Sequence, residues 1–263
     1  MPPLAKYPKI SVVTPNFNQG AFIERTLQSV LDQQYPELEY IVIDGGSTDD
    51  SREIISKYQE QLHYWVSEPD DGMYHAINKG FLRATGEIMC WINSDDVLWE
   101  GSLETVARIF QENPEISWLQ GYPSMIDEQD QLILQREPVA NRYYFLRGYH
   151  QKEFSFIQQE STFWTRSLWE KAGGTLNLEY QLAADFDLWM RFFEHEELYC
   201  TRQQLAAFRK REGQKSADMG AYLSEARRAV QQSKKKLRTR ERLQLKSAKL
   251  LKTNGTNFKV KWV

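Results

Sequence analysis

The chain of 263 residues is 41% hydrophobic and contains 13 Tyr, 13 Phe and 8 Trp, which supplies a sizeable core and excludes global disorder. The longest central apolar run, Ile88–Ile92, is far too short to span a bilayer, and the first residues show no apolar core of a signal peptide. The net charge of −3 conceals a division, because residues 1–199 carry 15 Lys and Arg against 32 Asp and Glu, whereas residues 200–263 carry 18 against 4.

The N-terminal quarter alternates two kinds of pattern. Ile10–Thr14 and Tyr40–Ile43 are short apolar runs that predict buried strands. Ala21–Gln34 and Ser51–Tyr58 have the spacing of amphipathic helices. Strand, helix, strand and helix in short order are typical of a parallel α/β sheet.

The next segments continue this alternation. Leu62–Ser67 predicts a third strand, and Met73–Thr85 predicts a helix with Gly86 as its C-cap. Glu87–Ile92 is almost continuously apolar, which predicts a central strand covered on both faces. This strand contains one of the only two cysteines, Cys90 and Cys200, whose spacing suits no metal site, so we expect two idle thiols in a reducing cytosol.

The remaining elements are less regular. We expect helices at Gly101–Gln111, Ser167–Ala172 and Phe186–Glu197. A strand is expected at Trp118–Tyr122 and a hairpin around Asp127–Asp130. The rest of residues 123–158 is not assigned. From Ala221 to about Lys252, a helix rich in Lys and Arg is predicted, since neither Pro nor Gly interrupts it.

Three polar loops follow predicted strands: Thr14–Asn18, Asp44–Ser51 and Asn93–Asp96. In an open parallel sheet, the ligand crevice lies at the carboxyl ends of the strands. Any one of these loops alone is better explained as a turn or a helix cap. Three of them at one edge of one sheet favour a binding site.

The third loop carries two adjacent carboxylates, Asp95 and Asp96, directly after a buried strand. They repel each other unless a positive charge lies beside them, and Mg²⁺ or Mn²⁺ with hard oxygen ligands meets that need. The alternative is an exposed turn with both groups in water. The chain has no Gly-rich phosphate loop or dinucleotide fingerprint, so a metal would carry much of the charge of any bound phosphates.

A second acidic pair, Asp185 and Asp187, begins the helix predicted near Phe186. Two residues apart on a helix, the side chains point about 200° apart. One of them is therefore free to face the cleft while the other supports the helix. The alternative is that both only complement the positive N-terminal end of the helix.

Together these residues resemble the family 2 glycosyltransferases, which have the GT-A fold, and in particular bacterial cell-surface polysaccharide members. The resemblance is continuous from about Ile10 to Ser216. It rests on nine segments, namely Ser11–Asn18, Gln33–Tyr35, Glu39–Asp49, Glu68–Gly80, Gly86–Glu87, Asn93–Asp96, Gln159–Ser161, Gly173–Gly174 and Ala184–Trp189.

The resemblance implies an α/β fold of GT-A type, with a mostly parallel, Rossmann-like sheet flanked by helices. Residues 1–220 would form the glycosyltransferase domain, with a nucleotide-sugar half at about 1–122 and an acceptor half at about 123–220. Residues 221–263 would form a basic helical tail. In the acceptor half, the aromatic side chains of Tyr143–Phe145 and Tyr149 are expected in the core rather than stacked on a sugar.

The resemblance also implies the site and the reaction, a metal-dependent, inverting hexosyl transfer from a nucleotide-sugar, with a UDP-sugar favoured. The residues expected to bind the nucleotide-sugar are Thr14, Pro15, Asn16, Asp44, Asn78, Lys79, Asp95 and Arg211. Asp96, with Asp95 beside it, would hold Mg²⁺ or Mn²⁺, which stabilises charge on the departing diphosphate. Asp185 would be the general base that deprotonates the acceptor hydroxyl.

Two positions depart from the family pattern. His75 stands where members commonly carry an acidic residue, and Arg211 stands where many have a His. Arginine does not ligate a cation, but it pairs with phosphate. These departures leave open the alternative that the chain is a catalytically idle relative of the family, which serves as a binding or scaffold partner. A nucleotidyltransferase is a further alternative, but the Gly-rich and basic N-terminal phosphate loop that it needs is absent.

The basic tail extends the expected partners beyond the nucleotide-sugar. Residues 225–252 contain eleven Lys and Arg against two Glu. Anionic headgroups attract such segments by about 1 kcal/mol per basic residue. We expect a cytoplasmic protein, held peripherally at the inner face of the cytoplasmic membrane near a glycan or lipid-linked acceptor, with no nucleic-acid partner. The alternative is a helix that packs on the domain or on a second subunit.

Overall fold

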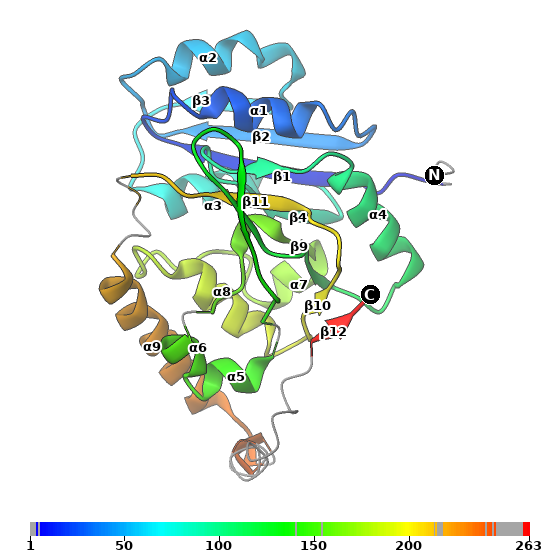
Figure 1. Cartoon of the computed structure of the whole chain (residues 1–263), viewed down its shortest axis with the longest axis vertical. Coiled ribbons are helices and arrows are strands. Elements are labelled where there is room, and N and C mark those ends of the chain that lie inside the picture. The colour runs from blue at the N-terminus through cyan, green and yellow to red at the C-terminus, as the bar shows by residue number, and fades with distance from the viewer. Residues whose placement is uncertain are drawn as a thin grey trace.

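The computed structural model describes residues 4, 6–139, 141–153, 155–212, 214, 218–239, 241–243, 245 and 260–263. Its centre is an eight-stranded sheet in the order β12-β10-β6-β9-β4-β1-β2-β3, with helices packed against it (Figure 1). A second, four-stranded sheet has the order β5-β11-β7-β8. This arrangement is the mixed α/β architecture that the alternating pattern predicts.

The first half of the chain forms the parallel part of the large sheet. Its elements are β1 (Ile10–Asn16), α1 (Ile23–Leu31), β2 (Leu38–Asp44), α2 (Ser51–Lys57), a 3₁₀ turn η1 (Gln59–Gln61), β3 (Tyr64–Ser67), α3 (Met73–Arg83) and β4 (Ile88–Trp91). Strand β1 pairs in parallel with β2 and β4, and β2 pairs in parallel with β3. Every residue of β1 and β4 is buried, which explains why apolar residues predominate in β1 and fill β4.

Gly86 is not the C-cap of α3, contrary to the sequence-based prediction. The helix ends at Arg83, and its cap, Ala84, already has an extended backbone with ψ of 136°. The amide of Gly86 instead donates to Ser11 Oγ at 2.8 Å, and a Cβ at this position would lie 2.5 Å from that oxygen. Glycine is therefore required by the close approach to β1.

The second half completes both sheets. Its elements are β5 (Val97–Leu98), α4 (Ser102–Glu112), β6 (Trp118–Gln120), β7 (Ser124–Ile126), β8 (Leu132–Gln135), α5 (Arg142–Leu146), α6 (Tyr149–Glu153), η2 (Gln159–Ser161), β9 (Thr162–Thr165), α7 (Arg166–Lys171), α8 (Ala184–Phe192), β10 (Tyr199–Cys200), β11 (Ala206–Arg209), α9 (Met219–Lys236) and β12 (Lys261–Trp262). The predicted hairpin is confirmed as the antiparallel pair β7 and β8. Strand β9, which the sequence does not reveal, runs antiparallel between β4 and β6.

A stack of tryptophans fixes α8 on the sheet. The ring of Trp189 in α8 lies parallel to that of Trp91 in β4, with centroids 5.8 Å apart. It also stacks on Trp118 in β6 at 5.5 Å. Large aromatic contacts of this kind dominate core energetics, so the backbone of α8 is held firmly against two strands. Tyr144 and Phe145 are likewise buried, as predicted, and so are both cysteines.

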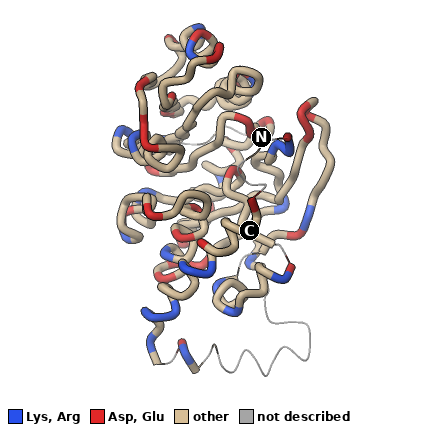
Figure 2. Tube along the Cα trace, turned by 90° about the vertical axis from the view of Figure 1, so that its left-hand side faces the viewer, with Lys and Arg blue, Asp and Glu red and all other residues tan. Residues whose placement is uncertain are grey.

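The predicted basic helix is interrupted at Leu237 and Arg238, and the described residues 239, 241–243 and 245 beyond this break are again helical. Helix α9 ends at Lys236, because Leu237 turns into the protein and adopts an extended backbone with ψ of 130°. Most of the predicted continuation to Lys252 lies outside the described residues. Lys and Arg gather at the lower end of the molecule, where α9 ends (Figure 2). In the described part of the chain, no helix is both long enough and apolar enough to cross a membrane.

Candidate functional site

The carboxyl ends of β1 and β2 meet at a buried carboxylate, Asp44, which has no exposed surface. Its oxygens accept hydrogen bonds from Asn16 Nδ2 at 2.7 Å, from the amide of Ser47 at 3.0 Å and from the hydroxyls of Ser47 and Ser67 at 2.5 Å each. Because Asn16 and Asp44 stand opposite each other in the parallel register, these bonds tie the two loops together. Asn16 Oδ1 is buried and lacks a hydrogen-bond partner among the described residues.

The neighbouring positions complete this end of the sheet. Thr14 is buried with its hydroxyl 3.0 Å from that of Tyr40, and Pro15 follows it in β1. Sequence reasoning did not identify Asp70, whose carboxylate lies so close to Gly45 that a Cβ there would be 2.8 Å from Asp70 Oδ2. The missing side chain of Gly45 thus lets a half-buried carboxylate approach the ends of β1 and β2.

The two adjacent aspartates of the loop after β4 face different environments. Asp96 has no exposed surface; its Oδ1 accepts from the amide of Arg209 at 2.9 Å and its Oδ2 from Asn93 Nδ2 at 3.2 Å. The side chain of Asp95 is 14% exposed, and its Oδ2 pairs with Arg211 Nε at 2.8 Å. Of the two carboxylates, Asp95 is therefore the one that a ligand can reach.

Two arginines at the end of β11 hold this loop. Arg209 is buried and donates to the carbonyls of Asp95 and Asp127, both at 2.7 Å, so it fastens the loop to the hairpin of β7 and β8. Arg211 donates through Nη2 to Gln19 Oε1 at 3.0 Å, in the loop after β1. The guanidinium of Arg211 thereby joins the ends of β1 and β4. The sequence contains no clear signal for Arg209, because its partners, the carbonyls of Asp95 and Asp127 and the carboxylate of Asp130, are distant in the chain.

A third carboxyl makes the site strongly acidic. Glu160 is buried, and burial together with the charge of Asp95 raises its pKa to about 7. Burial first, and then the charges of Asp95 and Glu160, raise the pKa of Asp96 well above its usual range. Desolvated like charges that repel one another favour a nearby cation. Arg211 supplies one such positive charge.

A divalent cation fits the donor set after β4 in part. Asp95 offers a carboxylate at the surface of the site, and Asn93 Oδ1 is buried without a hydrogen-bond partner among the described residues. Both are hard oxygen ligands of the kind that Mg²⁺ and Mn²⁺ prefer. Within the described ranges, however, no three His, Cys, Asp or Glu side chains are grouped as a metal site. Other ligands would have to come from substrate and water.

The predicted residues of α3 do not all face the same way. Asn78 pairs with the backbone of Leu176, donating from Nδ2 at 3.0 Å and accepting at Oδ1 at 2.8 Å. It therefore anchors the segment that leads to α8. Lys79 pairs with Glu68 at 2.5 Å, and its side chain is 23% exposed. His75 accepts from the amide of Asp71 at 3.0 Å, which orders the turn before α3.

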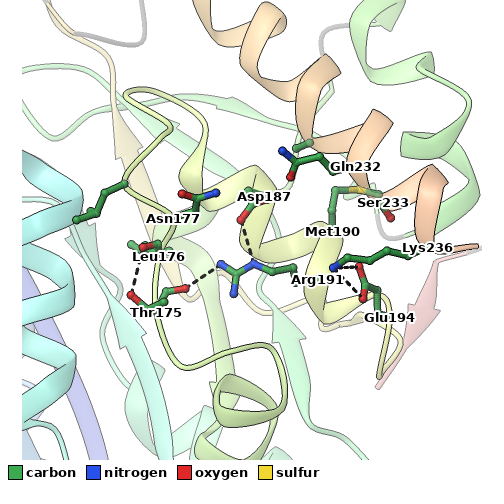
Figure 3. Close-up of a pocket in the computed structure, with 12 residues that line it drawn as sticks. Thr175, Leu176, Asn177, Asp187, Met190, Arg191, Glu194, Gln232, Ser233 and Lys236 are labelled. Atoms are coloured by element: carbon green, nitrogen blue, oxygen red, sulfur yellow. Dashed lines mark hydrogen bonds and ion pairs between the residues drawn. The ribbon is translucent and has the colours of Figure 1, made fainter.

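The side chains of the second acidic pair, Asp185 and Asp187, face different surroundings, as their helical spacing predicts. Asp185 is half-buried; its Oδ2 accepts from the hydroxyl of Tyr222 at 3.5 Å, and its buried Oδ1 has no hydrogen-bond partner among the described residues. Burial raises the pKa of Asp185 to about 7. Asp187 instead pairs with Arg191 Nε at 2.9 Å, beside a 460 Å³ cavity between α8 and α9 (Figure 3).

The structure thus brings most of the predicted residues to one edge of the sheet. Those at the ends of β1, β2 and β4 are Thr14, Pro15, Asn16, Asp44, Asp95, Asp96 and Arg211. Asn78 and Tyr74 connect α3 to the segment before Asp185, since Tyr74 donates to the carbonyl of Leu182 at 2.7 Å. No hydrogen bond or ion pair between described residues joins Asp185 directly to Asp95 or Asp96.

Three comparisons place this arrangement among known proteins. The family model described as Glycosyl transferase family 2 matches residues 11–169. The chain is 35% identical over 124 residues to the teichuronic acid biosynthesis glycosyltransferase TuaG of Bacillus subtilis, covering 46% of this chain and 49% of TuaG. The chain spans about half the length, or less, of the first curated relatives that it matches.

Solved structures share the fold. S. aureus TarS (residues 1–349) in complex with UDP-GlcNAc is similar with a TM-score of 0.68 and 19% identity, over 86% of this chain and 66% of that one. The mannosyltransferase PcManGT from Pyrobaculum calidifontis, in complex with GDP-Man and Mn²⁺, is similar with a TM-score of 0.59 and 20% identity, over 81% and 60% of the two chains. At these identities the likeness confirms the fold and nothing further.

Proposed function

The chain belongs to glycosyltransferase family 2, and we propose that it transfers a hexosyl group from a UDP-sugar to an acceptor hydroxyl, with inversion at the anomeric carbon. TarS is described with UDP-GlcNAc, and the name of TuaG refers to teichuronic acid biosynthesis. These two similarities support a UDP-sugar donor and a role in cell-surface glycan biosynthesis. The acceptor in this proposal is a glycan, free or linked to a lipid.

The environment of Asp185 supports the proposal most directly. Its Oδ1 has no hydrogen-bond partner among the described residues, and burial raises its pKa to about 7. A general base is most effective when its pKa lies near the working pH. Asp185 would take the proton of the acceptor hydroxyl as the oxygen attacks the anomeric carbon. Because the carboxyl is protonated below this pKa, transfer should rise with pH through about 7.

The donor nucleoside would occupy the ends of β1 and β2. Asn16 Oδ1 is available to a donor group of the ligand, and Thr14 and Pro15 shape the adjoining backbone. Asp44 already accepts four hydrogen bonds, so its main role in this proposal is to fix the two loops around the nucleoside. Asp70, beside Gly45, is the more exposed carboxylate at this end.

The diphosphate would lie between the loop after β4 and the cationic side chains. Arg211 suits this role because guanidinium pairs with phosphate in a fixed geometry, whereas the charge of Lys79, the other predicted cationic residue, is already paired with Glu68. A divalent cation held by Asp95, with Asp96 and Asn93 behind it, would supply further positive charge to the departing diphosphate. Since both oxygens of Asp96 are already bonded within the protein, Asp95 is the stronger candidate for direct contact.

The basic end of α9 supports a further part of the proposal, contact with an anionic membrane surface at the inner face of the cytoplasmic membrane. Lys234 and Lys235 are exposed, whereas Lys236 pairs with Glu194 at 3.0 Å. The opposite face of α9 packs on the domain, so this stretch of the predicted tail serves both as a packed helix and as a source of surface charge.

The test is a panel of UDP-sugars with glycan and lipid-linked acceptors, in EDTA or Mn²⁺. UDP release and the mass gain of the acceptor would be measured, and NMR would give the anomeric configuration of the product. We expect transfer with inversion that is lost in Asp185→Asn. Binding of UDP without turnover on any acceptor would favour the scaffold alternative, and a product with retained configuration would refute the proposed mechanism.

A further inference from the structure

Helix α9 lies against the N-terminal end of α8, the helix that carries Asp185. One face of α9 is buried through Ala226, Ala229, Val230 and Ser233. The Lys and Arg of α9 are exposed, and Figure 2 shows that basic residues gather at its lower end. The sequence predicts α9 as part of a separate tail, yet its buried face makes it an integral part of the domain.

Glu225 binds the backbone that enters α8. Its carboxylate accepts hydrogen bonds from the amides of Gln181, Leu182 and Ala183, and the shortest N···O distance is 2.9 Å for each of the three. The first amides of a helix have no partner within the helix, and Ala183, the N-cap of α8, has no side chain that could cap it. Glu225 therefore fixes, from another helix, the backbone that leads up to the N-cap of α8, and its negative charge complements the positive end of the helix dipole.

Tyr222 lies one turn before Glu225 on the same face of α9 and reaches Asp185. Its hydroxyl is 3.5 Å from Asp185 Oδ2, and its ring packs edge-on against Phe156 with centroids 5.0 Å apart. Burial, and then the charge of Asp185, raise the pKa of Tyr222 well above its usual range, so the hydroxyl stays protonated and donates. With Oδ2 held in this way, Oδ1 is the oxygen left to accept a proton.

We propose that α9 positions the catalytic base, with Glu225 holding the start of α8 and Tyr222 orienting the carboxylate of Asp185. This inference rests on the proposed role of Asp185 and adds two positioning residues to it. Neither of them touches the reacting atoms. Their effect is on where the carboxylate lies and on which protonation state it favours.

The two residues shift the proton affinity of Asp185 in opposite directions. Three groups from the elements packed against it face Asp185: Tyr74 from α3, and Tyr222 and Glu225 from α9. Burial raises the pKa of Asp185 first, the amides of Phe186 and Asp185 and the hydroxyl of Tyr222 lower it, and the charge of Glu225 raises it. Tyr74 is neutral because burial raises its own pKa well above the usual range.

This opposition gives a test that a merely structural role would not pass. Tyr222→Phe removes a donor to the charged carboxylate, so the acid limb of the kcat profile should move up by about 0.5–1 pH unit. At pH 6 this is a loss of roughly 3–10-fold in kcat, which should largely recover at pH 9, with the KM for the UDP-sugar unchanged. Glu225→Gln removes a negative charge and should move the same limb down.

Tyr74→Phe is the matched control. It also removes a buried tyrosine hydroxyl, but one that donates to the carbonyl of Leu182 rather than to Asp185. Its melting temperature should fall while the midpoint of the pH profile stays in place. Thermal melting of all variants would show which of them fold. If Tyr222→Phe does not fold, the positioning role is tested by whether the acid limb of the kcat profile moves to lower pH in Glu225→Gln.

The outcomes separate this inference from the proposed function. If Asp185→Asn transfers sugar as well as the wild type, the base is assigned wrongly and the positioning role falls with it. If Asp185→Asn is inactive but the profiles of Tyr222→Phe and Glu225→Gln coincide with that of the wild type, only the positioning role is refuted. A uniform loss of kcat at every pH, with an unmoved midpoint, also refutes it.

Discussion

In the proposed site, Arg211 and a divalent cation would compete for the carboxylate of Asp95, and Arg211→Ala tests this competition. The guanidinium pairs with Asp95 at 2.8 Å, and the two side chains are only 17% and 14% exposed. Asp96 and Glu160 add two buried carboxyls nearby. Removing Arg211 therefore leaves the carboxylate of Asp95 without its ion-pair partner, and the same change takes away a proposed ligand of the diphosphate.

The magnitude follows from the burial of the pair. A hydrogen bond to a charged group contributes about 1.5–3 kcal/mol when it is mostly removed from water. With about 2 kcal/mol for one guanidinium–phosphate contact, Arg211→Ala should weaken UDP binding in EDTA by about 30-fold. Asp95 is released in the same variant, so the apparent affinity for Mn²⁺ should increase by up to a similar factor.

Isothermal titration calorimetry measures both effects, with UDP titrated in EDTA and with Mn²⁺ titrated at saturating UDP. Arg202→Ala is the matched control, because it removes one positive charge from an exposed arginine whose guanidinium packs on Trp262. We expect Arg202→Ala to bind UDP and Mn²⁺ as the wild type does. If Arg211→Ala does the same, the guanidinium neither binds the diphosphate nor competes with the cation.

Three further predictions follow from single contacts. Asp185→Asn should lower the rate of transfer by about 10²-fold or more, as expected for the loss of a positioned proton acceptor, and should still bind UDP. Asp187→Asn should mainly lower the melting temperature, because it breaks the pair with Arg191. The reverse pattern would identify Asp187 as the base. Replacing Lys234 and Lys235 by Gln should weaken sedimentation with anionic vesicles at low salt, and an unchanged salt-sensitive binding curve would exclude this end of α9 as the contact. Gly86→Ala should cost about 2–3 kcal/mol in the free energy of unfolding, because its Cβ would overlap the backbone of β1; a denaturant midpoint equal to that of the wild type would contradict this.

The parallel half of the fold is predictable because its signals are local. Ile10–Thr14 and Glu87–Ile92 are apolar because both strands are covered on both faces, and each leads directly into a polar loop. Such runs identify the edge at which ligands bind before any contact is known. Strand β9 is only four residues long and pairs with two strands distant in sequence, so no periodicity reveals it.

Prediction of the site from the sequence is limited in the same way as prediction of the fold. The sequence identifies Asp95 and Asp96 as a pair, but only the fold shows that Asp96 is turned inward by the amide of Arg209. Sequence reasoning also assigns Tyr222 and Glu225 to a tail, because their contacts with α8 depend on how two helices pack. Side chains that act through distant backbone groups leave no motif. They are found only when the three-dimensional contacts are known.

The basic end of α9 and the residues that position Asp185 lie on one helix, and this sets the geometry of the proposed acceptor. Thirteen residues separate Tyr222 from Lys235, which is roughly 20 Å at about 1.5 Å per residue. If Lys234 and Lys235 contact the headgroups with α9 upright, Asp185 lies well above the lipid surface. An acceptor hydroxyl then has to be carried on several sugars above its lipid. We therefore expect a lipid-linked oligosaccharide to be used at a lower KM than a polyprenyl phosphate bearing one sugar, in vesicles of equal charge. If the short acceptor is preferred, α9 does not stand upright on the membrane.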